Sequence, residues 1–184
     1  MKSITKHSTG FLVILLGIIL AASASVFAKQ SISIIADANM AAPARHGIEK
    51  LQQAIEAKGL TVVKAGSIKD AQGDFVIVAG TAAEKVFKDL KVTLPVEAEA
   101  LTIKNTTING KPAIILCGFD AVGLMYAALD TADRISWCTD SAKPFEFVKD
   151  ISESPSVKDR AVSWYTMNRG YFESRLFDEA YLET

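Results

Sequence analysis

Short apolar runs alternate with longer amphipathic stretches through most of the chain. The runs Ser31–Ala36, Leu60–Lys64 and Phe75–Ala79 are rich in β-branched residues, which predicts three strands. The third run is continuously apolar, as in a strand that is covered on both faces. Strands of this kind, separated by helical patterns, predict an α/β domain.

Two stretches carry apolar residues at helical spacing. The first begins at Pro43, which is favoured in a first helical turn, and stops at Gly59. The second follows Asp120, a residue whose carboxylate can accept from the first free amides of a helix, and ends near Ser136. Each stretch places one apolar stripe on one side, so both helices are predicted to pack on the sheet.

A third helix is predicted from Thr81 to about Leu90. Thr81 and Glu84 have the spacing of a capping box, in which the hydroxyl and the carboxylate satisfy each other's backbone amides. The preceding Gly80 ends the third strand. This segment is therefore predicted to leave the sheet as a helix.

A hairpin follows. Leu101–Ile108 and Pro112–Cys117 flank Asn109-Gly110, a pair that tolerates the positive φ angles of a tight turn. A last short strand is predicted at Phe145–Val148. The hairpin is antiparallel, so the fold class is α/β (α+β): a mixed β-sheet with helices packed on it.

The first 28 residues have the pattern of a secretory signal peptide. Lys2 and Lys6 precede the apolar run Phe11–Ala22, and Val26–Ala28 suits a cleavage site. A run of about a dozen apolar residues is shorter than the roughly 20 that span a bilayer, which favours cleavage over an uncleaved anchor. We therefore expect a secreted or periplasmic protein that begins at Lys29 and meets the membrane only through this export signal.

Removal of the signal changes the net charge from −1 to −3, because the segment holds two lysines and no acid. Nucleic-acid partners need clustered Lys and Arg, so this nearly neutral composition argues against them. Residues 29–151 are predicted to form the α/β domain, 152–160 a linker, and 161–184 the start of a further domain.

The chain has two cysteines, Cys117 and Cys138. In an oxidising compartment they either form one disulfide or remain two buried free thiols, and the sequence leaves both alternatives open. Neither belongs to a C-x-x-C pair, and His46 is the one histidine after the signal, so no metal site is predicted.

Motifs of known reaction types do not occur in the sequence. There is no nucleophile elbow, no P-loop and no dinucleotide fingerprint, so no cofactor is expected and no catalytic residue is assigned. Pairs of acids such as Asp130 with Asp133 are typical of a solvated helix face. Asn105-Thr106-Thr107 is formally an acceptor for N-glycosylation.

Residues Asp120–Asp130, with Ala132–Ile135 after them, resemble a known helix. This G-L-M-Y-A type of helix closes the N-terminal domain of bacterial β-N-acetylhexosaminidases, glycoside hydrolase family 20, and of related α-glucuronidase-type enzymes. Those domains are mixed sheets with packed helices that precede a (β/α)8 catalytic barrel. The order of elements predicted here agrees with that plan.

The resemblance implies that Pro155 belongs to the linker and that Arg160 stands at the entry to the first barrel strand. Arg160 is then a substrate-binding residue whose guanidinium contacts sugar hydroxyls, with a linker salt bridge as the alternative. Trp164 and Tyr165 would stack on a sugar ring or fill the barrel core. Ala161 and Tyr165 replace a glycine and an aspartate of the hexosaminidases, which indicates a related family with the same domain plan.

The final run, Phe177–Leu182, starts a helix without any stop signal. We therefore expect the chain to be the front piece of a secreted glycoside hydrolase, with the barrel truncated in its first helix and the catalytic carboxylates beyond Thr184. The expected partners are the protein's own barrel and a carbohydrate, and this piece alone would be inactive. The alternative is a free-standing carbohydrate-binding or interaction module of the periplasm or cell surface.

Overall fold

The structure, a computed structural model, describes residues 30–87, 90 and 92–158. A first compact unit extends to Ser154, and of the second unit, which starts at Pro155, only residues 155–158 are described. The expected barrel strand and helix at 161–184 therefore lie outside the described residues. So does the expected signal peptide at 1–28.

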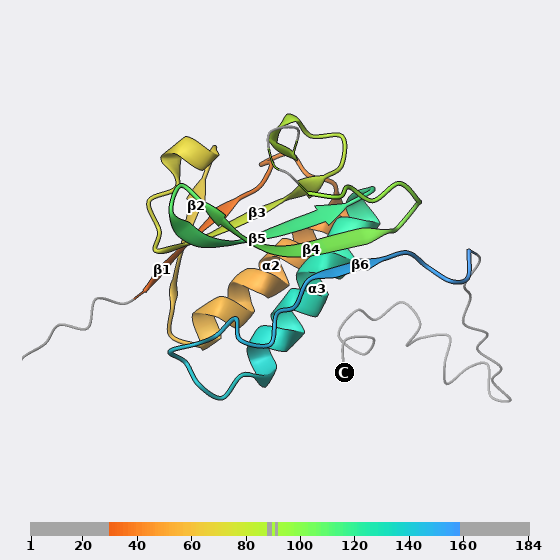
Figure 1. The fold of residues 1–184 in the computed structure, drawn as a ribbon. Coiled ribbons are helices and arrows are strands. Elements are labelled where there is room, and N and C mark those ends of the chain that lie inside the picture. The colour runs from red at the N-terminus through yellow and green to blue at the C-terminus, as the bar shows by residue number, and fades with distance from the viewer. Residues whose placement is uncertain (1–29, 88–89, 91, 159–184) are drawn as a thin grey trace, which may run out of the picture. The chain divides into compact units, whose positions relative to one another are not determined.

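The core of the first unit is a six-stranded sheet in the order β2-β1-β3-β5-β4-β6 (Figure 1). Its strands are β1 (Ser31–Ile35), β2 (Thr61–Ala65), β3 (Phe75–Thr81), β4 (Leu101–Ile108), β5 (Lys111–Gly118) and β6 (Ile151–Glu153). β2, β1, β3 and β5 are mutually parallel, whereas β4 is antiparallel to both of its neighbours. This mixed α/β sheet confirms the predicted fold class.

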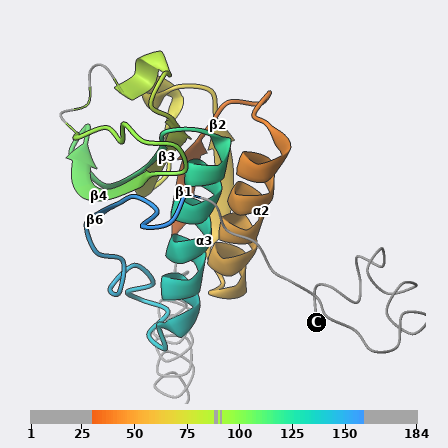
Figure 2. The same cartoon turned by 90° about the vertical axis from the view of Figure 1, so that its right-hand side faces the viewer.

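The two long helices, α2 (Ala42–Ala57) and α3 (Ala121–Trp137), lie on the same face of the sheet, as Figures 1 and 2 show. Both helices begin and end close to their predicted limits. Their buried residues join Ile32, Ile34, Ile77 and Leu116 of the strands in one apolar core. The helices pack closely at Gly47, where an added Cβ would lie 2.9 Å from the Cα of Met125.

The opposite face of the sheet is covered by short segments instead of long helices. The 3-10 helices η1 (Ile68–Asp70) and η2 (Lys85–Phe87) lie in the connections that follow β2 and β3. Phe87 is buried against Val76, Val78 and Ile115 on this face. This side of the sheet thus has its own apolar cluster, built from irregular chain.

The predicted helix from Thr81 to Leu90 is wrong. β3 continues through Thr81, and the helical part among the described residues is the single 3-10 turn η2. Half of the capping box does form, because the Glu84 carboxylate accepts from the Thr81 amide at 2.7 Å. The local helix signal yields to tertiary packing: Phe87, Val92 and Leu94 all face the second apolar cluster.

The predicted hairpin is confirmed. β4 and β5 pair in antiparallel register from Leu101↔Gly118 to Ile108↔Lys111. Asn109 and Gly110, at the turn between them, have φ angles of 51° and 77°. These are the left-handed values that a tight hairpin turn requires.

The strand predicted at Phe145–Val148 is also wrong in position. Residues 145–147 form a turn, and the Phe145 ring stacks on Phe75 with centroids 4.1 Å apart. The final strand is β6, which pairs with Leu101–Ile103 of β4. The run was predicted to be a strand because it is short and apolar. A loop whose aromatic side chain packs on the core has the same pattern, so the sequence does not distinguish a strand from such a loop.

Candidate functional site

The carboxyl ends of the parallel strands form the edge of the sheet where ligands usually bind in open α/β folds. β1 connects to β2 on one side through α2, while the chain leaves β3 toward the other side of the sheet. Neighbouring strands whose connections diverge leave a crevice between them. Two concave regions of this domain lie at this edge, one on each face of the sheet.

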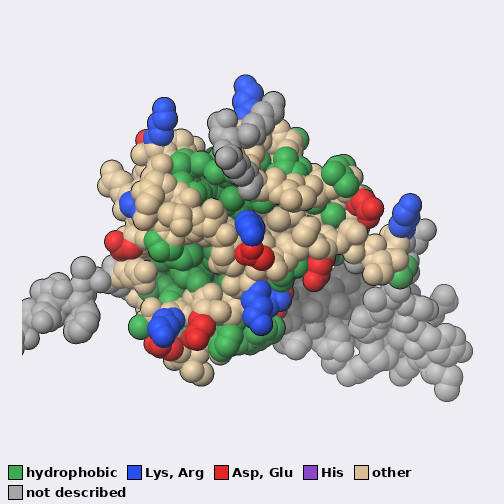
Figure 3. All heavy atoms as spheres, viewed as in Figure 1, with side chains coloured by type: hydrophobic (Ala, Val, Ile, Leu, Met, Phe, Trp, Pro, Cys, Tyr) green, Lys and Arg blue, Asp and Glu red, His purple; other side chains and the backbone are tan. Residues whose placement is uncertain are grey.

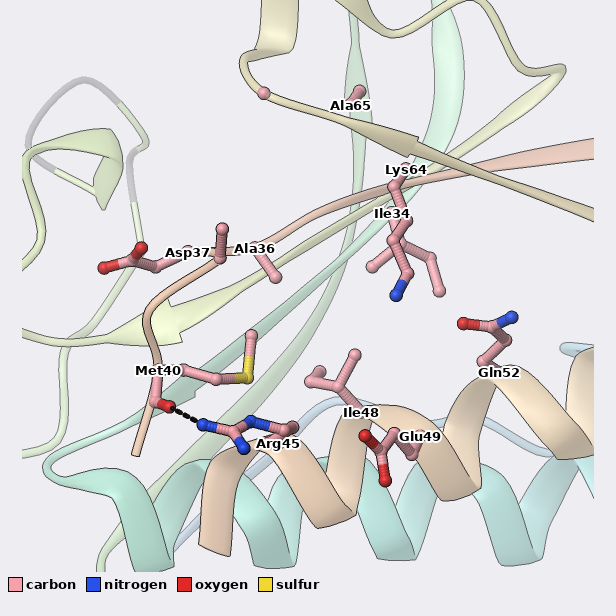
Figure 4. Close-up of a pocket in the computed structure, with 12 residues that line it drawn as sticks. Ile34, Ala36, Asp37, Met40, Arg45, Ile48, Glu49, Gln52, Lys64 and Ala65 are labelled. Atoms are coloured by element: carbon pink, nitrogen blue, oxygen red, sulfur yellow. Dashed lines mark hydrogen bonds between the residues drawn. The ribbon is translucent and has the colours of Figure 1, made fainter. Parts of the chain in front are cut away.

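The better-formed region is a pocket of about 390 Å³ between α2 and the ends of β1 and β2 (Figure 4). Its apolar lining comes from Ile34, Ala36, Met40 and Ile48. Ile34 and Ile48 are buried members of the main core, and Met40 packs against that core. The sequence places these residues correctly because the strand β1 and the apolar stripe of α2 face each other.

Polar side chains surround this apolar surface. Arg45 donates from Nη2 to the Met40 carbonyl at 3.2 Å, which fixes the guanidinium near the start of α2. Gln52 donates from Nε2 to Glu56 Oε1 at 2.8 Å, so its side-chain oxygen is left as an acceptor. Lys64 extends from β2, and in Figure 4 its ammonium is directed toward the space above Ile48.

Two carboxylates complete the lining of the pocket. Asp37 Oδ1 accepts from the Asn39 amide at 2.9 Å, a turn contact within its own loop, and in Figure 4 its carboxylate points away from Ile48. Glu49 lies on α2 between Arg45 and Gln52 in sequence. The lining therefore carries two cations and two anions around an apolar floor, with the Asp37 carboxylate turned away from that floor.

The second concave region, of about 860 Å³, is shallow and lies on the η2 side of the same edge. Glu84 and Lys85 contribute to it. An added Cβ at Gly80 would lie 2.6 Å from the Glu84 carboxylate, which shows how tightly this side chain folds back on the end of β3. A carboxylate in that place disfavours an anion, so the end of β3 does not offer the anion site that strand-to-helix junctions often form.

Catalytic chemistry finds little support in the described part of the chain. Asp130, from one of the acidic pairs in the sequence, accepts hydrogen bonds from Arg134 Nε and Nη2 at 2.6 and 3.1 Å. Asn105 donates from Nδ2 to Val148 O and Asp150 Oδ1, so its amide nitrogen is already used. Across residues 30–87, 90 and 92–158, no cluster of three or more His, Cys, Asp or Glu side chains is arranged to hold a metal ion.

The residues that carry the family resemblance are structural. Asp120 Oδ1 accepts from the amides of Val122 and Gly123 at 3.0 and 2.9 Å, and its Oδ2 accepts from the Glu99 amide at 3.0 Å. A Cβ at Gly123 would lie 2.3 Å from the Ala100 carbonyl oxygen. This motif therefore fixes the start of α3 against the chain that enters β4.

Gly118, at the end of β5, also packs against the start of α3. A Cβ there would lie 2.0 Å from the Leu124 amide nitrogen. The backbone of β5 thus runs against the first turn of α3 with no room for a side chain. The motif meets a packing requirement of the domain and places no reactive group.

Both cysteines are buried, and both are free thiols in the structure. Cys117 belongs to the apolar cluster on the sheet face opposite α3, whereas Cys138 directly follows α3. Burial raises the pKa of the Cys117 thiol to about 12, with Glu84 adding a smaller effect in the same direction. Cys138 Sγ donates to the Lys143 carbonyl at 3.2 Å.

Arg160, the substrate-binding residue implied by the resemblance, lies outside the described residues, as do Trp164 and Tyr165. The pocket residues Arg45, Gln52 and Lys64 were not identified from the sequence. Lys64 is brought to the site by the parallel register that pairs it with Ile34. The sequence does place Asp37 directly after the first strand, at the carboxyl edge of the sheet. It does not show which strand pairs with the first one and so contributes Lys64.

Charged side chains are distributed without a single-sign patch on the face that Figure 3 shows, where lysines and arginines alternate with acids. Within the described ranges, every helix is too short or too polar to cross a bilayer.

Comparison with known proteins gives a likeness in fold to solved structures. No protein-family model matches the chain, and no curated protein matches it. Among solved structures, the chain is similar to one described as a GH138 enzyme targeting pectin rhamnogalacturonan II, with a TM-score of 0.50 and 16% sequence identity. The match covers 78% of this chain and 20% of that one. At this identity the likeness concerns the fold: this domain is built like a part of a much longer glycoside hydrolase.

Proposed function

We propose that the α/β unit is a non-catalytic N-terminal domain of an exported glycoside hydrolase, where it packs against the catalytic barrel. The observation that carries this proposal is the fold shared with about a fifth of a glycoside hydrolase chain. A domain that corresponds to one part of such an enzyme is expected to act through the rest of it. The reaction would be hydrolysis of an O-glycosidic bond by carboxylates of the barrel.

The resemblance in α3 supports the same domain plan from independent residues. Asp120, Gly123 and Leu124 belong to the motif that closes the N-terminal domain of hexosaminidases and α-glucuronidase-type enzymes. The structure gives these residues a packing role, which is what a scaffold domain needs. In this proposal the parent enzyme is a relative of both families that shares their domain plan.

Arg160 is the one substrate contact that we propose for this chain. It would stand at the start of the first barrel strand and present the planar fork of its guanidinium to sugar hydroxyls. The export signal at residues 1–28 would deliver the enzyme to the periplasm or the medium, where polymeric carbohydrate is available.

A second candidate function is a free-standing carbohydrate-binding or interaction module. The pocket beside α2 favours it, because a module of this kind needs a binding site within the domain itself. In that case residues 155–184 would be an appendage, and no hydrolysis would be associated with the protein.

Hydrolysis of chromogenic glycosides by two purified products tests the proposal. One product comprises residues 1–184, and the other is the complete translation product of the same reading frame. We expect activity only in the complete product, with a fall in kcat/KM of at least about tenfold for Arg160→Ala and partial recovery for Arg160→Lys. Equal activity of both products, or none in the complete product, would contradict the proposal.

A further inference from the structure

The pocket between α2 and the edge strands has features of a ligand site that the scaffold role does not require. Its volume of about 390 Å³ falls in the range of small-molecule sites, roughly 300–1,000 Å³. It lies at the carboxyl ends of β1 and β2, whereas the strand connections diverge between β1 and β3.

The composition of the pocket narrows the class of ligand. Arg45 and Lys64 share the pocket lining with Glu49, and Asp37 adds a second negative charge at the rim although its carboxylate points away from Ile48, so a ligand with a net charge would meet attraction and repulsion together. A neutral molecule that both donates and accepts hydrogen bonds can use both kinds of group.

The placement of the donors and acceptors adds a second constraint. Figure 4 shows the Lys64 ammonium and the Gln52 side-chain oxygen on one side of the space and Arg45 with Met40 on the other. One nitrogen of Arg45 donates to the Met40 carbonyl, and the Gln52 side-chain nitrogen donates to Glu56. The other guanidinium N–H groups and the Gln52 side-chain oxygen can therefore bind a ligand. The Lys64 ammonium forms no ion pair or hydrogen bond among the contacts of the described residues.

The apolar floor completes the match. Ile34, Met40 and Ile48 form a surface beneath these polar groups. The C–H face of a pyranose ring can pack on such a surface while its hydroxyl groups exchange hydrogen bonds with the rim. A linear polyol lacks the rigid face, and an aliphatic acid lacks the distributed hydroxyls.

We propose that this pocket is a monosaccharide-binding subsite that takes a neutral hexopyranose or deoxyhexopyranose unit. The position and lining of the site come from this domain alone, whereas the choice of a sugar over another neutral polar ring rests on the proposed function. Binding is weak, as expected for an open site without an aromatic platform.

Methyl NMR of the full chain labelled with ¹³C at the methionine methyl groups tests this proposal directly. Met40 lies in the pocket floor and reports on binding, while Met125, on α3, is a matched internal control. D-glucose, D-galactose and L-rhamnose are the probes, with L-leucine and hexanoate as comparison ligands of zwitterionic and anionic class.

We expect a saturable shift of the Met40 methyl signal with at least one sugar, with a Kd of roughly 1–10 mM, and no shift of Met125. Lys64→Ala should weaken binding about tenfold, since it removes a charge-assisted hydrogen bond. Lys50→Ala, on the exposed side of α2 and outside the pocket lining, should leave the Kd unchanged.

The proposal is overturned if no sugar shifts Met40, if Met125 shifts together with Met40, or if leucine or hexanoate binds more tightly than every sugar. It is equally overturned if Lys50→Ala weakens binding as much as Lys64→Ala. None of these results depends on hydrolysis, so failure of the subsite and failure of the hydrolase assignment remain distinguishable.

Discussion

At the scale of single residues, the structure explains glycines and an aspartate that the sequence presents only as a motif. Asp120 holds three backbone amides from two segments of chain, those of Val122, Gly123 and Glu99. Gly123 allows the Ala100 carbonyl to approach where any side chain would collide. The motif therefore acts as a joint between the entry to β4 and the start of α3.

Gly123→Ala should destabilise the domain by at least about 2 kcal/mol, because its Cβ would lie 2.3 Å from a backbone oxygen. Helix propensity alone would predict the opposite sign, since alanine is favoured over glycine in a helix. Urea denaturation gives the free energy of unfolding. Gly66→Ala is the matched control, because no atom lies within 4 Å of the added Cβ, and its effect should stay within about 0.5 kcal/mol.

Cys117 should be unreactive in the folded protein. Burial raises the pKa of its thiol to about 12, and the thiolate is the reactive form. Alkylation with iodoacetamide at pH 8, mapped by mass spectrometry, should modify Cys117 only after denaturation. A Cys117–Cys138 cross-linked peptide in a digest of protein purified without reducing agent would contradict the free thiols of the structure.

At the scale of elements, β4 is tied to the segment before β6 by one carboxylate. Asp150 pairs with Lys104 and accepts from the Asn105 amide at 2.7 Å. The hydrogen bond from Lys104, followed by that from the Asn105 backbone, lowers the pKa of Asp150 from 3.8 to about 2. These contacts align β6 on the edge of the sheet.

The pH dependence of stability follows from the sign of that shift. A carboxyl group with a lowered pKa in the folded state stabilises the fold above pH 3.8, and this contribution is lost as the pH falls through about 2. Asp150→Asn should therefore lower the thermal midpoint at pH 6 and have little effect at pH 2. Asp133→Asn, at an exposed position on α3, should leave the midpoint unchanged at both values, and a constant offset for Asp150→Asn would contradict the assignment.

The elements that the sequence predicted correctly are those whose local signals agree with their packing. The apolar stripe of α2, the Asp120 cap of α3 and the Asn109-Gly110 turn each specify a structure that the tertiary contacts then use. The segment after Thr81 differs because Phe87 is buried on the sheet while its capping signal favours a helix. Burial of Phe87 outweighs the local helix propensity in this segment. A single sequence does not show which of these two effects is larger.

The candidate pocket was harder to predict than the elements that form it. Its apolar residues follow from the facing surfaces of β1 and α2. Lys64 joins them only through the register that pairs it with Ile34 across two parallel strands. Parallel register depends on contacts between residues far apart in sequence, so it is not visible in the pattern of either strand alone.

At the scale of the whole molecule, the first compact unit extends to Ser154 and forms a mixed sheet with both faces covered. Its fold is similar to a fifth of a glycoside hydrolase.

The proposed export signal gives a prediction at the same scale. Protein recovered from the periplasm or medium should begin at Lys29, because Val26–Ala28 precedes the cleavage point. N-terminal sequencing checks this. Ala28→Leu should slow processing and leave the precursor at the membrane, and a mature protein that still begins at Met1 would contradict the signal peptide.

The reading frame beyond the codon for Thr184 tests the central claim most directly. We predict a continuation of several hundred residues in which strands and helices alternate, as in a (β/α)8 barrel, with paired carboxylates at strand ends. A stop codon directly after Thr184 would contradict the hydrolase assignment and leave the binding module as the function of this domain.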